Sequence, residues 1–267
     1  MSQNGAAASG RWGDLRARTL SGIAMLVVGI GAIWAGGMVF AALAVVVTGL
    51  MIWELARMTD PGQGLRAQLL GLLAALALAA VLALHSPFAL GALVVPPVAL
   101  ALTQRRDRAL VLFYGLAVML AGYGLVALRD GLGVEVIAWI VAVVVMSDVA
   151  GYFAGRVLGG PKFWPRVSPK KTWSGTIAGW VGAALVGFAF AGADGGWALV
   201  ALSPFVAFAG QMGDIVESAI KRHVGIKDSS NLIPGHGGVL DRFDALIGAV
   251  LVVLLIAQIA PLPFAGG

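Results

Sequence analysis

The sequence predicts an all-α integral membrane protein that crosses the bilayer about nine times, with its N-terminus in the cytoplasm. Of its 267 residues, 60% are hydrophobic and 12% are charged, whereas charged residues supply about 25% of an ordinary soluble domain. The apolar residues form runs close to the roughly 20 residues that a helix needs to cross the hydrocarbon layer. Lipid is therefore the solvent for most of the chain, which excludes a soluble globular domain.

Nine apolar runs, separated by charge, proline or paired glycine, are the candidate spans. The first two runs meet at Gly36 and Gly37, and the third and fourth meet at Ser86 and Pro87. The runs lie near residues 19–35, 37–53, 68–84, 88–103, 109–128, 134–155, 173–192, 196–213 and 243–260. The first run lacks a convincing cleavage site, so we expect an uncleaved helix and not a signal peptide.

The basic residues support nine spans, because Lys and Arg favour cytoplasmic loops and successive loops alternate between the two sides of the membrane. Seventeen of the 18 lie at the N-terminus or in the second, fourth, sixth and eighth connections, and Arg129 alone lies on the other side. The N-terminus is then cytoplasmic and the C-terminus external. Topology and anionic substrates account for the net charge of +5, so we expect no nucleic-acid partner.

Polar residues concentrate in the second half of the chain. We predict about five N-terminal spans over residues 1–130 and a catalytic membrane region over 131–267, with cytoplasmic loops at 156–172 and 214–244. The chain has no cysteine, which excludes a disulfide, a thiolate metal site and a cysteine nucleophile.

Four carboxylates are predicted to meet at the cytoplasmic edge of this region. Asp214, Glu217, Ser218 and Lys221 follow the i, i+3, i+4, i+7 spacing of one helix face, and Asp241 and Asp244 repeat the i, i+3 step. Hard oxygen ligands of this kind suit magnesium, which binds one or two carboxylates together with substrate phosphates.

The basic residues of the same loops indicate a phosphate ligand, because they can make charge-assisted hydrogen bonds to its oxygens. They are Lys170, Lys171, Lys221, Arg222, Lys227 and Arg242. Between them, the segment Pro234-Gly-His-Gly-Gly238 offers backbone N–H groups to an anion. His236 lies between glycines and beside the acids, which favours a functional role.

Asp148 is predicted to lie inside the sixth span, where an ionisable residue costs about 2.5–3.5 kcal/mol and indicates function. Tyr152 and Gly155 follow it on the same helix face. Gly151 and Gly155 form a small-xxx-small pair, which is typical of close helix packing.

Three stretches resemble the phosphatidate cytidylyltransferase (CDP-diacylglycerol synthase) family. The first reads SAIKRHVGIKD followed by PGHGGVLDRFD over residues 218–244, the second is SPKKTWSG from Ser168, and the third is the D-x-x-x-Y-x-x-G element from Asp148. The resemblance spans about residues 145–245. Ser174 and Ser229 depart from the family pattern, which usually has a glutamate and an aromatic residue at these positions.

The resemblance implies transfer of a cytidylyl group from CTP to phosphatidic acid, giving CDP-diacylglycerol and pyrophosphate. It implies magnesium, with a second cation such as potassium, in a homodimer of the bacterial inner membrane whose active site faces the cytoplasm. Asp214 and Asp241, with Asp244, are the implied metal ligands. The implied catalytic residues are Lys221, Arg222, Lys227, His236 and Arg242. The implied phosphate-binding residues are Ser168, Lys170, Lys171, Thr172, Ser218, Gly237 and Gly238. Asp148, Tyr152, Glu217 and Asp228 support them.

Other membrane functions remain as alternatives. A CDP-archaeol synthase would use another lipid, and a polyprenol or dolichol kinase would transfer the γ-phosphoryl group of CTP. A CDP-alcohol phosphotransferase is disfavoured because the chain lacks a D-G-x-x-A-R element. An anion transporter is disfavoured because the charged residues gather at one membrane edge and not at the midplane.

Overall fold

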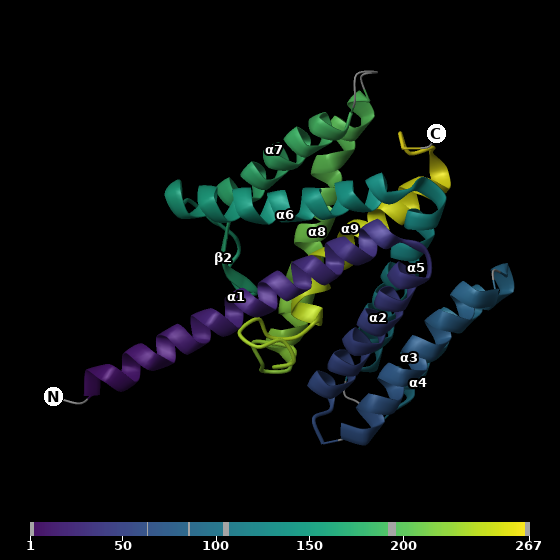
Figure 1. Ribbon diagram of the computed structural model, residues 1–267, viewed down its shortest axis with the longest axis horizontal. Helices are drawn as coiled ribbons and strands as arrows, with labels where there is room; N and C mark the ends of the chain where they lie inside the picture. The colour runs from purple at the N-terminus through teal and green to yellow at the C-terminus, as the bar shows by residue number, and fades with distance from the viewer. Residues whose placement is uncertain (1–2, 63, 85, 104–106, 192–195, 265–267) are drawn as a thin grey trace.

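The computed structural model describes residues 3–62, 64–84, 86–103, 107–191 and 196–264, with side chains from residue 16 onward. Helices dominate these residues, and a two-stranded antiparallel hairpin is the sheet among them (Figure 1). The elements are α1 (Gln3–Ala35), α2 (Gly37–Thr59), α3 (Gly64–Leu84), the 3₁₀ helix η1 (Pro87–Val94), α4 (Val95–Leu102), α5 (Arg108–Leu132), α6 (Val134–Val157), β1 (Lys162–Trp164), β2 (Ser168–Thr172), α7 (Trp173–Phe190), α8 (Trp197–His223) and α9 (Leu240–Ile259). The predicted all-α membrane architecture is confirmed.

Eight of the nine predicted spans correspond to helices that are long and apolar enough to cross a bilayer, within the part of the chain that the structure describes. The break between the first two is confirmed at Gly36 and Gly37, whose φ angles of 63° and 48° suit glycine because it has no Cβ. The prediction that a loop begins at residue 214 is wrong, because α8 continues to His223 and the loop begins after it. Basic residues in its last turn favour this extension by interacting with the helix dipole.

In place of the fourth predicted span, the chain forms two short apolar helices, η1 and α4, of eight residues each. Pro96 and Pro97 lie in the first turn of α4. Because proline has no backbone N–H to donate, it is tolerated at the start of a helix but cannot continue a preceding one. The 3₁₀ helix rises about 2 Å per residue and the α-helix 1.5 Å, so the pair covers about 28 Å. Neither helix alone is long enough to cross the ~30 Å hydrocarbon layer.

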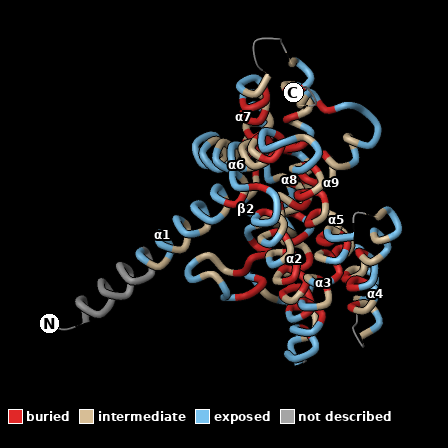
Figure 2. The backbone as a smooth tube through the Cα atoms, turned by 45° about the vertical axis from the view of Figure 1, so that its right-hand side comes forward, coloured by how far each residue is buried: buried red, intermediate tan, exposed pale blue. Residues whose placement is uncertain are grey.

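Two groups of helices pack side by side, and the N-terminal helix contacts α2 of the first and α6 of the second (Figures 1 and 2). In the first group α2 packs against α3 and α5, and α4 packs against α5. In the second, α6 packs against α7, α7 against α8, and α8 against α9. Contacts between α5 and α9 join the groups. The buried residues of Figure 2 therefore form one continuous core.

Glycines bring the helices of the second group close together. A Cβ on Gly151 would meet the carbonyl oxygen of Gly175 at 3.1 Å, and one on Gly210 would meet the carbonyl oxygen of Ala245 at 3.2 Å. Small residues allow such backbone approach between membrane helices. The predicted packing role of Gly151 is confirmed, and the polar ends of α6, α8 and α9 are brought into one place.

Charged side chains make contacts at both ends of the helices. At one end, which we call the basic end, Lys171 pairs with Asp214, and His223 Nε2 lies 2.9 Å from Asp107 Oδ1. At the opposite end, Arg129 Nε donates to the carbonyl oxygen of Ile33 at 3.2 Å. This bond satisfies an otherwise unpaired carbonyl at the C-terminus of α1, so the isolated arginine has a structural role.

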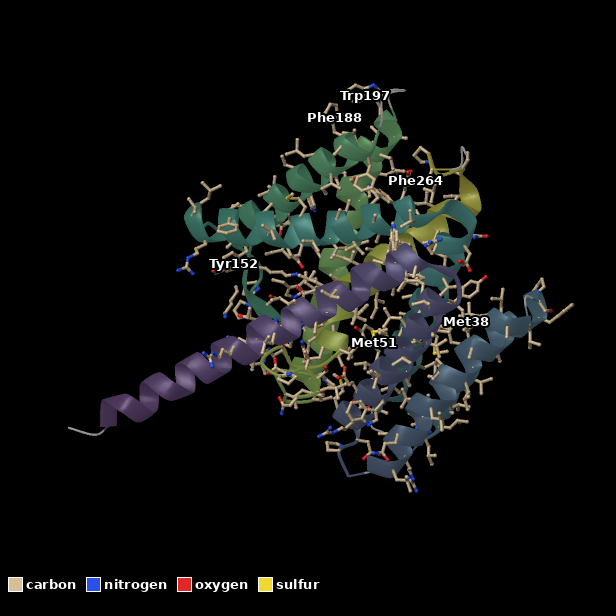
Figure 3. All side chains as sticks on the ribbon, viewed as in Figure 1. Met38, Met51, Tyr152, Phe188, Trp197 and Phe264 are labelled. Carbon is tan, nitrogen blue, oxygen red and sulfur yellow. The ribbon has the colours of Figure 1, made fainter. Side chains whose placement is uncertain are left out.

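Large apolar side chains cover the outside of the helices (Figure 3). Trp197 and Phe188 project at one outer edge, with ring centroids 6.3 Å apart, and Met38 is exposed on α2. Met51, on the same helix, is buried. Exposure of apolar residues on several helices is the arrangement expected for a lipid-facing surface.

Candidate active site

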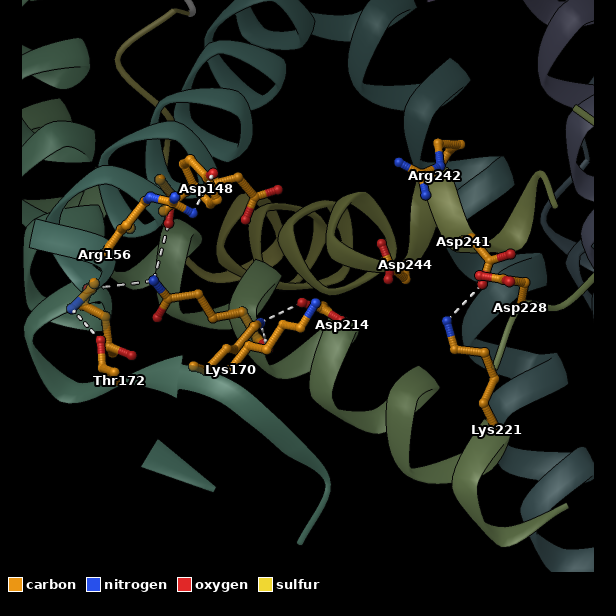
Figure 4. A pocket seen from close by; sticks show the side chains of 18 residues that line it. Asp148, Arg156, Lys170, Thr172, Asp214, Lys221, Asp228, Asp241, Arg242 and Asp244 are labelled. Carbon is orange, nitrogen blue, oxygen red and sulfur yellow. Dashed lines mark hydrogen bonds and ion pairs between the residues drawn. The ribbon is translucent and has the colours of Figure 1, made fainter. Parts of the chain in front are cut away.

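A cavity of about 540 Å³ lies where α6, α7, α8, α9 and β2 meet at the basic end (Figure 4). It is lined by Ser147, Asp148, Gly151, Tyr152, Gly155, Arg156, Lys170, Lys171, Thr172, Gly175, Thr176, Gln211, Asp214, Lys221, Asp228, Asp241, Arg242 and Asp244. Five of these residues are aspartates and five are Lys or Arg, so the lining is electrically balanced when all ten are ionised. Four segments distant in the sequence contribute to it.

Eleven predicted site residues line this cavity. They are Asp148, Tyr152, Lys170, Lys171, Thr172, Asp214, Lys221, Asp228, Asp241, Arg242 and Asp244. The other eight are not in its lining: Ser168, Glu217, Ser218, Arg222, Lys227, His236, Gly237 and Gly238. Among these, Arg222 is exposed and donates to the carbonyl oxygen of Ile226 at 3.4 Å, and Lys227 is exposed. A direct role of Arg222 and Lys227 in catalysis stays a prediction, and their exposed positions outside the lining do not favour it.

Asp241 is buried and holds the best-defined hydrogen-bond set in the site. Its Oδ2 accepts from Ser229 N at 2.9 Å, Ser229 Oγ at 3.0 Å and Gly238 N at 2.8 Å. Its Oδ1 accepts from Lys221 Nζ at 2.6 Å. The bond from Gly238 resembles half of a capping box, because a side chain in the first helical turn reaches back to an N–H before it. These bonds fix the carboxylate against the cavity wall.

Two lysines neutralise the other acids of the predicted helix face. Lys221 pairs with Glu217, whose side chain is fully buried, as well as with Asp241. Lys171 pairs with Asp214, which also accepts from Ser218 Oγ at 3.1 Å. The predicted i, i+3, i+4, i+7 face is thus confirmed as a set of contacting side chains. Glu217 and Ser218 contact the lining residues Lys221 and Asp214 without lining the cavity themselves.

The predicted metal ligands meet in one cavity without forming a closed metal site. No group of three or more His, Cys, Asp or Glu side chains in the described ranges is arranged to hold an ion. Asp244 lies near enough to Asp214 and Asp148 for their charges to repel, and the three acids offer hard oxygen donors to one space. This donor chemistry fits magnesium, although Asp214 is paired with Lys171 and Asp241 with Lys221.

The Pro234–Gly238 segment is held by contacts that its glycines make possible. Gly237 has φ 84°, and a Cβ on it would lie 2.8 Å from Asp241 Oδ2. A Cβ on Gly238 would overlap Ser229 Oγ and the Glu54 carboxylate. The N–H of Gly238 already donates to Asp241, so it does not face an open anion site. The lack of side chains on Gly237 and Gly238 instead lets the backbone pack closely against Asp241, Ser229 and Glu54.

His236 lies against the N-terminal helix and not in the cavity lining. Its Nδ1 is 2.8 Å from Ser21 Oγ, and the same hydroxyl lies 2.9 Å from the carbonyl oxygen of Pro234. Helix α1 therefore holds the glycine-rich segment in place from outside.

Two polar features were missed by the sequence analysis. Gln211 lines the cavity, donates to Ser147 Oγ at 3.1 Å and accepts from Trp180 Nε1 at 3.1 Å, so it ties α8 to α6 and α7 at the cavity wall. Glu54, in α2, is fully buried and accepts hydrogen bonds from Val239 N, in the loop before α9, and from Leu240 N, at the start of α9. A lone acid within an apolar run was the available signal for Glu54.

Comparison with known proteins shows the family to which the chain belongs. The profile of the cytidylyltransferase family matches residues 16–260, which include α2–α9 and most of α1. The chain belongs to the cytidylyltransferase family. Proteins named phosphatidate cytidylyltransferase are among its relatives. The one from Brucella suis is 34% identical over 260 residues, which covers 92% of this chain and 94% of the relative.

Two further relatives of this cytidylyltransferase match a shorter region at higher identity. The phosphatidate cytidylyltransferase of Bacillus subtilis is 40% identical over 129 residues, or 44% of this chain. That of Staphylococcus aureus is 39% identical over 119 residues, or 43% of this chain. Family membership therefore extends over the N-terminal helices as well as the residues that line the cavity.

Proposed function

We propose that this chain is a nucleotidyltransferase that transfers the cytidylyl group of CTP to phosphatidic acid, releasing pyrophosphate. Its substrates would then be CTP and a membrane lipid, and its product CDP-diacylglycerol. The observation that carries the proposal is the single cavity in which the SPKKT, D-x-x-x-Y-x-x-G and LDRFD segments meet, in a chain whose relatives are named for this activity.

The lining suits a reaction between two polyanions. A phosphate oxygen of the lipid attacks the α-phosphorus of CTP, a new P–O bond forms, and the bond to the bridging oxygen of pyrophosphate breaks. Such phosphoryl chemistry depends mainly on positioning and on stabilisation of charge. Lys170, Lys171 and Arg156 from one side of the cavity and Lys221 and Arg242 from the other can hold the phosphates by charge-assisted hydrogen bonds.

Magnesium is the cofactor that we propose, with a second cation such as potassium. Since the ten charged lining residues balance, the phosphates of both substrates add uncompensated negative charge to the cavity. Asp214, Asp241 and Asp244 would hold the ion, which would supply Lewis-acid stabilisation of the leaving pyrophosphate. Lys171 and Lys221 could then turn from these carboxylates to phosphate oxygens. Chelation by EDTA should reduce turnover to background, and added magnesium should restore it.

The site would lie at the cytoplasmic surface of the bacterial inner membrane. In support, the cavity is at the basic end of the helices, and Lys and Arg favour the cytoplasmic side. A lipid phosphate at that surface and a nucleotide in the cytosol could both reach it. The further proposal of a homodimer is based on the family resemblance, and light scattering of the detergent-solubilised protein tests it.

Labelled CTP tests the reaction directly. We expect purified protein in mixed micelles with phosphatidic acid to move label from the α-phosphate of CTP into lipid. Label entering lipid from the γ-phosphate would instead indicate a kinase, and a panel of lipid acceptors would reveal a different lipid substrate. If α-label stays entirely in free nucleotide while solute crosses proteoliposomes, the proposed function is wrong and a transporter is favoured.

A further inference from the structure

Glu54 forms the most complete hydrogen-bond set of any buried acid outside the cavity lining. Its Oε1 accepts from Ser230 Oγ at 2.6 Å and from Val239 N at 2.9 Å. Its Oε2 accepts from Leu240 N at 2.6 Å and lies 3.2 Å from Ser229 Oγ. All four donors belong to the loop 224–239 or to the first residue of α9, although Glu54 itself is in α2.

The burial of this acid needs a physical reason. Its side chain is fully buried within a mostly apolar helix, and a buried carboxylate is destabilising unless its lone pairs are satisfied. The donors from Val239 and Leu240 are among those that a helix leaves unpaired at its N-terminus. A carboxylate at that position also interacts favourably with the helix dipole. Glu54 therefore caps α9 from a different helix.

The same contacts link Glu54 to the active site. Three consecutive backbone N–H groups are divided between two acids, since Gly238 donates to Asp241 while Val239 and Leu240 donate to Glu54. The Ser229 hydroxyl lies between the two carboxylates, 3.2 Å from Glu54 Oε2 and 3.0 Å from Asp241 Oδ2. A shift of the loop away from Glu54 would therefore move the donors that hold Asp241.

We propose that Glu54 is a positioning residue for the reaction, acting through the loop 224–239 to hold the Asp241 carboxylate at the cavity wall. This inference rests on the proposed function for its catalytic consequence, but not for the loop contacts themselves. Asp241 touches the cavity, whereas Glu54 does not line it. Helix α2 thus contributes to the site by holding the loop 224–239 in one conformation.

Glu54→Gln tests the proposal, because the amide NH₂ cannot accept a hydrogen bond from a backbone N–H. We expect kcat for cytidylyl transfer to fall about 10–100-fold, the range seen when the residues that orient functional ligands are changed, with a smaller change in KM for CTP. Hydrogen–deuterium exchange of peptides covering 226–240 should become faster. Glu135→Gln is the matched control, since Glu135 is an exposed acid on α6, and it should change neither quantity.

Ser230→Ala provides a second test if Glu54→Gln does not fold. It removes the hydroxyl that donates to Glu54 Oε1 at 2.6 Å and leaves every donor to Asp241 in place, so kcat should fall while the protein stays folded. We expect the loss to be about tenfold, at the lower end of the range for Glu54.

The two measurements separate the possible failures. Faster exchange with kcat unchanged would overturn the positioning role and leave Glu54 a purely structural cap. Unchanged exchange in Glu54→Gln would overturn the proposal altogether, and so would unchanged kcat in Ser230→Ala if the first variant does not fold. If the wild-type protein transfers no cytidylyl group, the proposed function fails by itself, and the exchange of the loop then decides whether Glu54 holds it.

Discussion

Replacing Lys221 by methionine tests the most deeply buried ion pairs of the site. Lys221 pairs with Glu217 and Asp241. The exposed fraction of the side chain is 12% for Lys221, 0% for Glu217 and 3% for Asp241, so solvent screens these pairs little. Removing one member of a buried pair typically costs about 3–5 kcal/mol, because the remaining charge loses its partner. We expect Lys221→Met to lower the free energy of unfolding by that amount.

Most of this cost should come from Glu217. Without Lys221, Asp241 keeps its three donors from Ser229 and Gly238, whereas neither carboxylate oxygen of Glu217 has a hydrogen-bond partner among the described residues. Adding Glu217→Gln to Lys221→Met removes the stranded charge, so the double variant should recover stability, with a coupling energy of about 1–3 kcal/mol.

Reversible unfolding in mixed micelles, measured on the wild type, both single variants and the double variant, gives this coupling. Residues that do not interact are additive within about 0.5 kcal/mol. Additivity within that margin would refute the reasoning, because it would mean that Lys221 does not neutralise Glu217.

Three further changes have definite expected outcomes. Asp214→Asn should abolish cytidylyl transfer in the labelled-CTP assay while gel filtration shows a folded protein, because it removes a carboxylate from the cavity. Gly238→Ala should destabilise the protein by about 2–5 kcal/mol through overlap with Ser229 and Glu54 and the loss of their hydrogen bonds, as measured by thermal unfolding. Gly64→Ala is its control, since a Cβ there meets nothing within 4 Å. Ser21→Ala should speed hydrogen exchange in peptides around His236, because it frees the segment from α1.

Each of these expectations has a clear opposite. Near-normal turnover by Asp214→Asn would contradict its assignment to the site. Equal melting temperatures for the two alanine variants would show that Gly238 has more room than the structure indicates. Unchanged exchange around His236 would show that α1 does not hold the glycine-rich segment.

The spans were predictable because the signal for each is local. A run of about 20 apolar residues has to be helical in lipid, where every backbone N–H and C=O must be satisfied within the segment. The same logic failed to anticipate the form of the fourth span, where Pro96 and Pro97 interrupt the α-helix. Hydropathy alone places the end of the eighth apolar run at residue 213, whereas α8 continues through charged residues to His223.

The acids and bases of the site were predictable as a group, because helical spacing places Asp214, Ser218 and Lys221 on one face. Their pairing was not, since Lys171 reaches Asp214 from a strand and Lys221 reaches Asp241 across a loop. The prediction for His236 treated its glycine-rich surroundings as an anion site. In the structure its ring nitrogen meets Ser21, 215 residues away in the sequence.

By itself, then, the sequence determined the helical membrane architecture, the end at which charge collects and the residue types available for phosphate chemistry. These follow from the length of apolar runs and the positions of basic residues, which no packing detail can alter. Only the tertiary structure decided which partner each charged group has. Glu54 meets Ser229 across 175 residues of chain, and a bond of that kind exists only because α2 packs where the loop before α9 can reach it.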